Sequence, residues 1–289
     1  MEIQIPLVIF TSFLAWAAGI FGTQCVLALK KQGGEVQLPA LITSVVLLAV
    51  GGIAVVFHLT HPFNLFNGFG HITSGITQEL IAIVLLAVAM VLFFLMLRRS
   101  GDKTVPQWLA VVGIVLVLVL IFAMGHSYMM ASLPAWDTVL QMLSLLGAAC
   151  VMGPATVAFI ASLRGVDIKG IGLMTIIGTA VNAVLSAAYM FAMEASSASF
   201  QSFAYYFDPT HPNHAIASAD NVSLFTGDST TALVVAVIAI VVTFVGAFVG
   251  KKQGDWKVWG AVVAIAGLVC AVALRVMMYT MGETLFMLY

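Results

Sequence analysis

Long apolar runs separated by short polar connections dominate this chain. Eight runs are long enough to cross a bilayer, because a hydrocarbon core about 30 Å thick requires about 20 apolar residues in a helix. The runs lack the two-residue alternation of membrane-spanning strands, and an open sheet would leave backbone groups unpaired in lipid. The pattern therefore predicts an all-α integral membrane protein with eight transmembrane helices, at roughly 6–29, 39–58, 77–97, 106–127, 138–162, 170–194, 231–250 and 257–281.

The connections between these runs are short, with one exception. Residues 195–230, between the sixth and seventh runs, form a polar segment rich in Ser, Asp, Asn and His. Long connections of this kind are usually functional or disordered. The chain begins without a basic residue, so we expect the first run to remain as a helix and not to be cleaved as a signal peptide. We expect one eight-helix transmembrane domain over residues 1–289, with a long outer loop at about 195–230.

Composition supports the membrane assignment and removes other classes of protein. Hydrophobic residues make up 62% of the chain and charged residues only 8%, against about 25% charged residues in soluble domains. This excludes a soluble enzyme, a disordered protein and a nucleic-acid-binding protein, which would need a basic surface. The expected environment is the lipid bilayer. The three cysteines, Cys25, Cys150 and Cys270, all lie in apolar runs, and an iron–sulfur cluster needs about four, so we expect no cluster in this chain.

The basic residues follow every second span. Connections after the second, fourth and sixth spans contain no Lys or Arg, and neither does the N-terminus. Basic connections face the cytoplasm, which predicts that both termini lie on the outer side. Arg275 departs from the pattern, since it lies within the eighth span near its outer end. The other basic residues follow spans one, three, five and seven: Lys30, Lys31, Arg98, Arg99, Lys103, Arg164, Lys169, Lys251, Lys252 and Lys257.

The histidines are predicted on the side of the membrane opposite to most Lys and Arg residues. A carboxyl group and an arginine are predicted on the same side as the histidines. By this topology, His58, Glu79, His126 and Arg275 come from four helices at similar depth near the outer boundary. Ionisable groups in spans are costly and mark ligand or proton pathways. A histidine and a carboxylate can accept two protons, and a guanidinium can hold a carbonyl or phenolate oxygen. These residues therefore suit oxidation of a quinol. All six histidines lie on this side: His58, His61, His71, His126, His211 and His214.

Simpler roles stay open for each of these residues. Glu79 could complement the positive end of its helix, and Arg275 could extend to the outer headgroups. His58 and His61 could cap a helix end, and His126 could make an ordinary buried polar contact. His211 and His214 could simply be solvated in their polar loop.

Three other functions compete with a quinol site. His58 and His126 could ligate one haem, and the pair His211 and His214 could begin a zinc site. A proton-coupled transporter would need ionisable groups near the middle of the membrane. The candidates here lie at one side instead, which argues against transport.

Short motifs spread along the chain resemble the membrane anchor subunits of dimethyl sulfoxide reductase. The likeness extends from residue 6 to about residue 280 and agrees with the span count and the outer termini. The motifs that carry it are Pro6-Leu7-Val8-Ile9-Phe10-Thr11, His58-Leu59-Thr60-His61-Pro62-Phe63-Asn64-Leu65-Phe66-Asn67 followed by Gln78-Glu79, Gly153-Pro154, and Arg275-Val276-Met277-Met278-Tyr279.

The resemblance implies an anchor in the cytoplasmic membrane of a prokaryote, without haem or clusters of its own. Such a subunit holds an iron–sulfur subunit and a molybdopterin catalytic subunit at the membrane, oxidises menaquinol and passes the electrons to its iron–sulfur partner. His58 and Glu79 would be the quinol-site residues, and Arg275 and Tyr279 would match a pair in the family's last helix. His61 stands where the family often has a small residue, so His58 and His61 are alternative quinol ligands. An anchor of the polysulfide-reductase type, which reduces quinone, is the alternative within this class.

Overall fold

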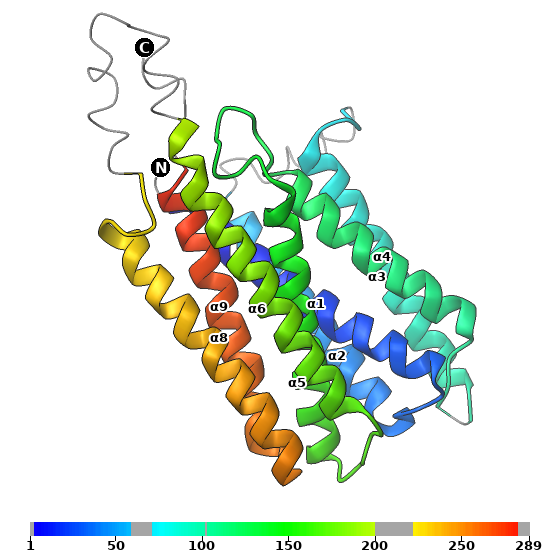
Figure 1. The fold of residues 1–289 in the computed structure, drawn as a ribbon. Coiled ribbons are helices and arrows are strands. Elements are labelled where there is room, and N and C mark those ends of the chain that lie inside the picture. Colours follow the sequence, from blue (N-terminus) through cyan, green and yellow to red (C-terminus); the bar gives the residue numbers. More distant parts are fainter. Residues whose placement is uncertain (1–2, 59–70, 102, 200–221, 283–289) are drawn as a thin grey trace, which may run out of the picture.

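Eight long helices make up almost all of the described structure. The computed structural model describes residues 3–58, 71–101, 103–199 and 222–282. Within these residues there is no strand, and all eight helices are long and apolar enough to cross a membrane (Figure 1). The predicted all-α class and the eight predicted spans are therefore confirmed. The helices are α1 (Ile5–Leu29), α2 (Gly34–Val56), α3 (Gly75–Arg99), α4 (Gln107–His126), α5 (Val139–Leu163), α6 (Ile171–Ser196), α8 (Gly227–Gln253) and α9 (Trp256–Thr280).

The largest difference between predicted and observed helix bounds is at the start of α2. The helix begins at Gly34, five residues before the predicted run, because polar residues there are paired with α1. The side-chain amide of Gln24 donates to the backbone carbonyl of Gln37 at 2.8 Å, and Gln37 returns a bond to the carbonyl of Gln24 at 3.4 Å. Both glutamines are buried. Hydropathy alone assigns such residues to a connection, whereas here they join two helices.

Helices α1 and α5 form the centre of the molecule. Helix α1 packs against α2, α4 and α5, and helix α5 packs against α1, α6 and α9. Helix α3 packs mainly on α4, and α8 packs mainly on α9. The result is two groups of four helices, α1–α4 and α5–α9, which meet along α1 and α5 (Figure 1).

Glycines bring the backbones of α1 and α5 into contact. A Cβ atom added to Gly19 would lie 2.2 Å from the carbonyl oxygen of Ala149, and one added to Gly153 would lie 2.1 Å from the carbonyl oxygen of Gly19. No larger residue fits at this separation. Membrane helices commonly associate through small residues, because lipid supplies little hydrophobic force between them.

The two ends of the bundle differ in chemistry. We call the end that carries His58, His71 and His126 the histidine end, and the opposite end, with Lys30 and all other Lys and Arg residues except Arg275, the basic end. The start of α1 and the end of α9 both lie at the histidine end (Figure 1).

Candidate functional site

A cavity of about 460 Å³ lies at the histidine end. It is enclosed by the first turns of α1 and α3, the last turns of α2 and α9, and the connection between α4 and α5. Its size falls within the range of small-molecule sites, which are mostly apolar with a few placed polar groups. The lining residues are Gln4, Leu7, Phe10, Gly52, Val55, Val56, His58, Ile76, Glu79, Leu80, Ile83, Ser127, Tyr128, Met130, Leu133, Trp136 and Tyr279.

Glu79 is the acidic group of this cavity. It lies in the second turn of α3 and is only 6% exposed. One carboxylate oxygen, Oε2, accepts a hydrogen bond from Ser127 Oγ at 3.2 Å. The other, Oε1, is buried and has no hydrogen-bond partner among the described residues. A buried carboxylate oxygen of this kind is available to a ligand in the cavity.

A close approach of two segments places Glu79 beside Ser127. A Cβ atom on Gly75, at the start of α3, would lie 2.7 Å from the Cα atom of Ser127. Only glycine permits this contact, which sets the first turn of α3 against the end of α4. Glu79, one turn further along α3, then reaches the Ser127 hydroxyl.

Aromatic side chains form the wall on the side of α9. The rings of Tyr128 and Trp136 are 5.9 Å apart at 59°, and those of Trp136 and Tyr279 are 5.2 Å apart at 87°. Trp136 Nε1 donates to the carbonyl oxygen of Met278 at 2.6 Å. This bond ties the connection between α4 and α5 to the last helix. The tilted and edge-on contacts are the arrangements that aromatic rings prefer.

Arg275 lies behind this wall and does not line the cavity. It is 3% exposed, and its guanidinium carbon lies 5.7 Å from the centre of the Tyr128 ring. Nη1 donates to the sulfur of Met278 at 3.0 Å, and Nη2 has no partner within the described part of the chain. A thioether is a weak acceptor, so this buried cation is poorly compensated. Its charge acts on the cavity through Tyr128.

Tyr128 is held as a neutral phenol. Burial, followed by the nearby charges of Glu79 and Tyr279, raises the pKa of Tyr128 well above its usual value. The phenol therefore keeps its proton and can serve as a hydrogen-bond donor.

Two unsatisfied polar atoms belong to residues that line the cavity. Glu79 Oε1 and the Tyr279 hydroxyl are buried without a partner in the regions that the structure describes. Next to them, Gln141 Oε1 and Arg275 Nη2 are in the same condition. Buried polar atoms are nearly always hydrogen-bonded, and exceptions call for an explanation such as a ligand.

The structure brings some of the predicted site residues together and separates others. His58, Glu79 and Tyr279 line one cavity, with the exposed His58 at its rim, and Arg275 is adjacent. His126 lies elsewhere, in a surface hollow with Gln78 and Met142. The structure therefore places His58 and His126, which were considered as alternative haem ligands, in different hollows. His61, His211 and His214 lie outside the described residues.

Four residues of the site received no role from the sequence: Gln4, Tyr128, Trp136 and Ser127. Tyr128 and Trp136 lie in a connection at the same end as Glu79. Their aromatic side chains at that position were the signal in the sequence that could have assigned them to the site. Hydropathy gave no reason to fold this connection inward over the cavity.

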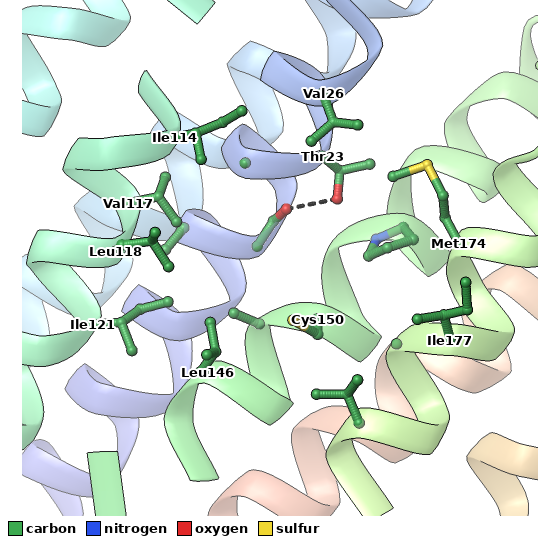
Figure 2. Close-up of a pocket in the computed structure, with 17 residues that line it drawn as sticks. Thr23, Val26, Ile114, Val117, Leu118, Ile121, Leu146, Cys150, Met174 and Ile177 are labelled. Carbon is green, nitrogen blue, oxygen red and sulfur yellow. Dashed lines mark hydrogen bonds between the residues drawn. The ribbon is translucent and has the colours of Figure 1, made fainter. Parts of the chain in front are cut away.

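A second, mostly apolar hollow lies deeper in the bundle. It measures about 290 Å³ and is formed by α1, α4, α5 and α6 (Figure 2). Thr23 points into this region, but its hydroxyl already donates to the carbonyl oxygen of Gly19 at 2.8 Å (Figure 2). The free thiol of Cys150 also lines the hollow. In the described ranges no group of three or more His, Cys, Asp or Glu side chains could hold a metal ion.

Eight long apolar helices, with an apolar cavity at one end that is lined by a buried carboxyl group, define a multi-pass membrane protein. A family model described as DMSO reductase anchor subunit (DmsC) matches residues 1–286, essentially the whole chain, and the chain belongs to this family. It is thus a membrane anchor subunit of the DMSO reductase type, as the sequence motifs indicated. The comparison with curated proteins gives no match.

Proposed function

We propose that the cavity at the histidine end binds menaquinol and that the complex oxidises it there. The observation that carries the proposal is the buried carboxyl group of Glu79, which lines an apolar cavity, has one oxygen without a hydrogen-bond partner among the described residues, and is accompanied by an exposed histidine at the rim. An apolar slot suits the quinol ring and tail. The carboxylate and the histidine suit its two protons.

The reaction releases two protons and two electrons from each quinol. In our proposal Glu79 accepts the proton of one hydroxyl group, because it is the buried base of the cavity. His58 accepts the second proton and passes it to water, because it is exposed at the rim and a ring nitrogen of histidine can take up a proton. His61 is the alternative for this second role. The quinone product then leaves without a net charge.

Arg275 and the two tyrosines would hold the quinol oxygens. Tyr128 keeps its proton and can donate to an oxygen that gains negative charge as its proton leaves. The positive charge of Arg275, 5.7 Å behind the Tyr128 ring, favours the same transient anion. Tyr279 also lines the cavity, and its side chain interacts with that of Tyr128. Arg275 is thus a supporting residue in this proposal, and the tyrosines contact the substrate.

Family membership supports the partners and the location of the reaction. We propose that an iron–sulfur subunit docks at the histidine end and takes the electrons, and that a molybdopterin subunit reduces the terminal acceptor. The chain itself carries neither haem nor cluster in this proposal. It lies in the cytoplasmic membrane of a prokaryote with both termini outside, since the basic end faces the cytoplasm under the positive-inside rule.

The distribution of buried charge favours a quinol site over a transporter. Among the described residues the buried charged side chains are Glu79 and Arg275, and both lie at the histidine end. A transporter would need such groups along a path across the membrane.

Two histidines at equivalent positions provide the test. His58 follows the last turn of α2 and His126 is the last residue of α4, both at the histidine end, but only His58 lines the cavity. In the assembled complex, with a menaquinol analogue as donor, His58→Ala should slow quinol oxidation about 10²-fold, and His126→Ala should leave it unchanged. Equal rates in the two variants would exclude His58 as the proton acceptor. Turnover only in the direction of quinone reduction would favour the polysulfide-reductase type.

A further inference from the structure

A second polar cavity lies at the basic end, remote from the quinol site. It measures about 390 Å³ and is formed by the start of α2, the end of α3, the turn after α3, and Arg164 after α5. Three segments far apart in the sequence therefore contribute to it. Its lining residues are Gly34, Glu35, Leu38, Pro39, Leu97, Arg98, Ser100, Gly101, Lys103 and Arg164.

The cavity carries an excess of positive charge. Lys103 forms an ion pair with Glu35, which neutralises both side chains. Arg98 and Arg164 line the same cavity, and neither forms an ion pair with a carboxylate among the described residues. The Glu35 carboxylate also interacts with Arg164, so one carboxylate faces three cations and an excess of positive charge remains for an anion. Guanidinium groups match phosphate oxygens, because their parallel N–H groups can donate in pairs.

The charges stand above an apolar wall. Leu38 and Pro39 lie about one turn inside α2, and Leu97 lies just inside the end of α3, so all three face the cavity from the side of the bilayer core. The guanidinium carbon of Arg98 is 5.9 Å from the centre of the Phe94 ring, one turn back along α3, so this side chain extends along its helix toward the bilayer core. A soluble anion would use the cations alone. An amphiphile would use both the cations and the apolar wall.

We propose that this cavity binds the phosphate headgroup of an anionic phospholipid. Arg98 and Arg164 hold the phosphate, and the first methylenes of the acyl chains pack on Leu38, Pro39 and Leu97. Basic pockets between membrane helices bind such headgroups. The bound lipid links α2 and α3, which contact each other only sparsely in the protein itself. The proposal is independent of the quinol reaction.

Native mass spectrometry of the full chain in detergent, titrated with phosphatidylglycerol, tests the site. Each arginine should contribute about fivefold to the affinity for this lipid. The double variant Arg98→Gln with Arg164→Gln should therefore bind it about 20-fold more weakly. The matched control is Arg99→Gln with Lys169→Gln, which removes the same charge from exposed residues outside the cavity. It should bind as the unmodified chain does. Phosphatidylcholine should bind equally weakly to all three proteins.

Three results would overturn the proposal. One is undiminished binding of phosphatidylglycerol to the double glutamine variant. Another is an equal loss in the control pair, which would show a diffuse surface charge effect. The third is displacement of the lipid by millimolar inorganic phosphate, which would assign the cavity to a soluble anion. If the double variant does not fold, the single variants Arg98→Gln and Arg164→Gln replace it, each with an expected loss of about fivefold.

Discussion

A carboxyl group that is 6% exposed in a membrane helix, with one oxygen lacking a partner, needs a physical reason. Glu79 does not form an ion pair with Arg275, although both are buried at the histidine end. Tyr128 stands between the cavity and the guanidinium, and Ser127 supplies the one hydrogen bond that Glu79 receives. This arrangement leaves the carboxylate free to exchange a proton with a ligand. A firm ion pair would fix its charge.

The Glu79→Gln variant separates proton transfer from binding. The amide has the same shape and can still accept from Ser127, but it cannot take up a proton. We expect quinol oxidation by the complex to fall about 10²-fold, while a quinone-site inhibitor still binds. Glu194→Gln is the control, because Glu194 lies at the same end but accepts hydrogen bonds from Ser223 and the backbone amide of Leu224. A Glu79→Gln complex with full turnover would remove this carboxylate from the mechanism.

At the scale of elements, the seam between α2 and α3 explains how a quinol with a long tail could enter. Gly52 and Val55 from α2 and Ile76 and Ile83 from α3 line the cavity on this side. The two helices contact each other sparsely. A Cβ atom added to Gly52 would meet nothing within 4 Å, so the glycine faces open space. We therefore expect the quinol tail to leave the cavity between these helices.

A bulky residue at Gly52 should close this entrance without disturbing the fold. Gly52→Phe should raise the KM for a long-tailed menaquinol about tenfold or more, since a ring would occupy space used by the substrate. Ile53→Phe is the control, because Ile53 is exposed and does not line the cavity. Steady-state kinetics with the assembled complex measure both. A KM unchanged in Gly52→Phe would mean that the tail passes elsewhere.

The contact between α1 and α5 should be far less tolerant. Gly19→Leu would force a side chain into the Ala149 carbonyl, so we expect a loss of about 1–3 kcal/mol in stability and a lower Tm in detergent. Gly22→Ala should have little effect, because its Cβ would lie 3.5 Å from Val117, an ordinary contact. Thermal unfolding followed by circular dichroism compares the two. A Tm preserved in Gly19→Leu would show that the helices can separate without penalty.

The sequence predicts a feature of this fold well when local hydrophobicity determines it, and poorly when tertiary contacts determine it. The spans are predictable because lipid imposes length and hydrophobicity on every helix. Glu79 and Arg275 were predictable because a charged group within a span is rare. The pairing of Gln24 with Gln37 and the inward position of Trp136 could not be predicted. Both depend on tertiary contacts, and hydropathy assigns such polar or aromatic residues to connections or to the membrane interface. His126 was expected at the same depth as His58, and packing places it in a separate hollow.

For the whole molecule, charge is divided between the two ends. Every described Lys lies at the basic end, and both buried ionisable groups that we assign to the quinol site lie at the histidine end. The deeper hollow between these ends is apolar (Figure 2). The described part of the molecule therefore shows no chain of charged groups that could conduct protons across the membrane. The protons of the quinol should leave on the side where they are released.

This division predicts that turnover does not charge the membrane. If the iron–sulfur partner also docks at the histidine end, both protons and electrons from the quinol stay on one side. Liposomes that contain only the complex, supplied with menaquinol and a terminal acceptor, should then show turnover without a membrane potential on a voltage-sensitive dye. A potassium gradient with valinomycin verifies that the liposomes are tight and the dye responds. A potential that builds up with turnover would require a route for charge from one end of the bundle to the other, and so would contradict the one-sided site.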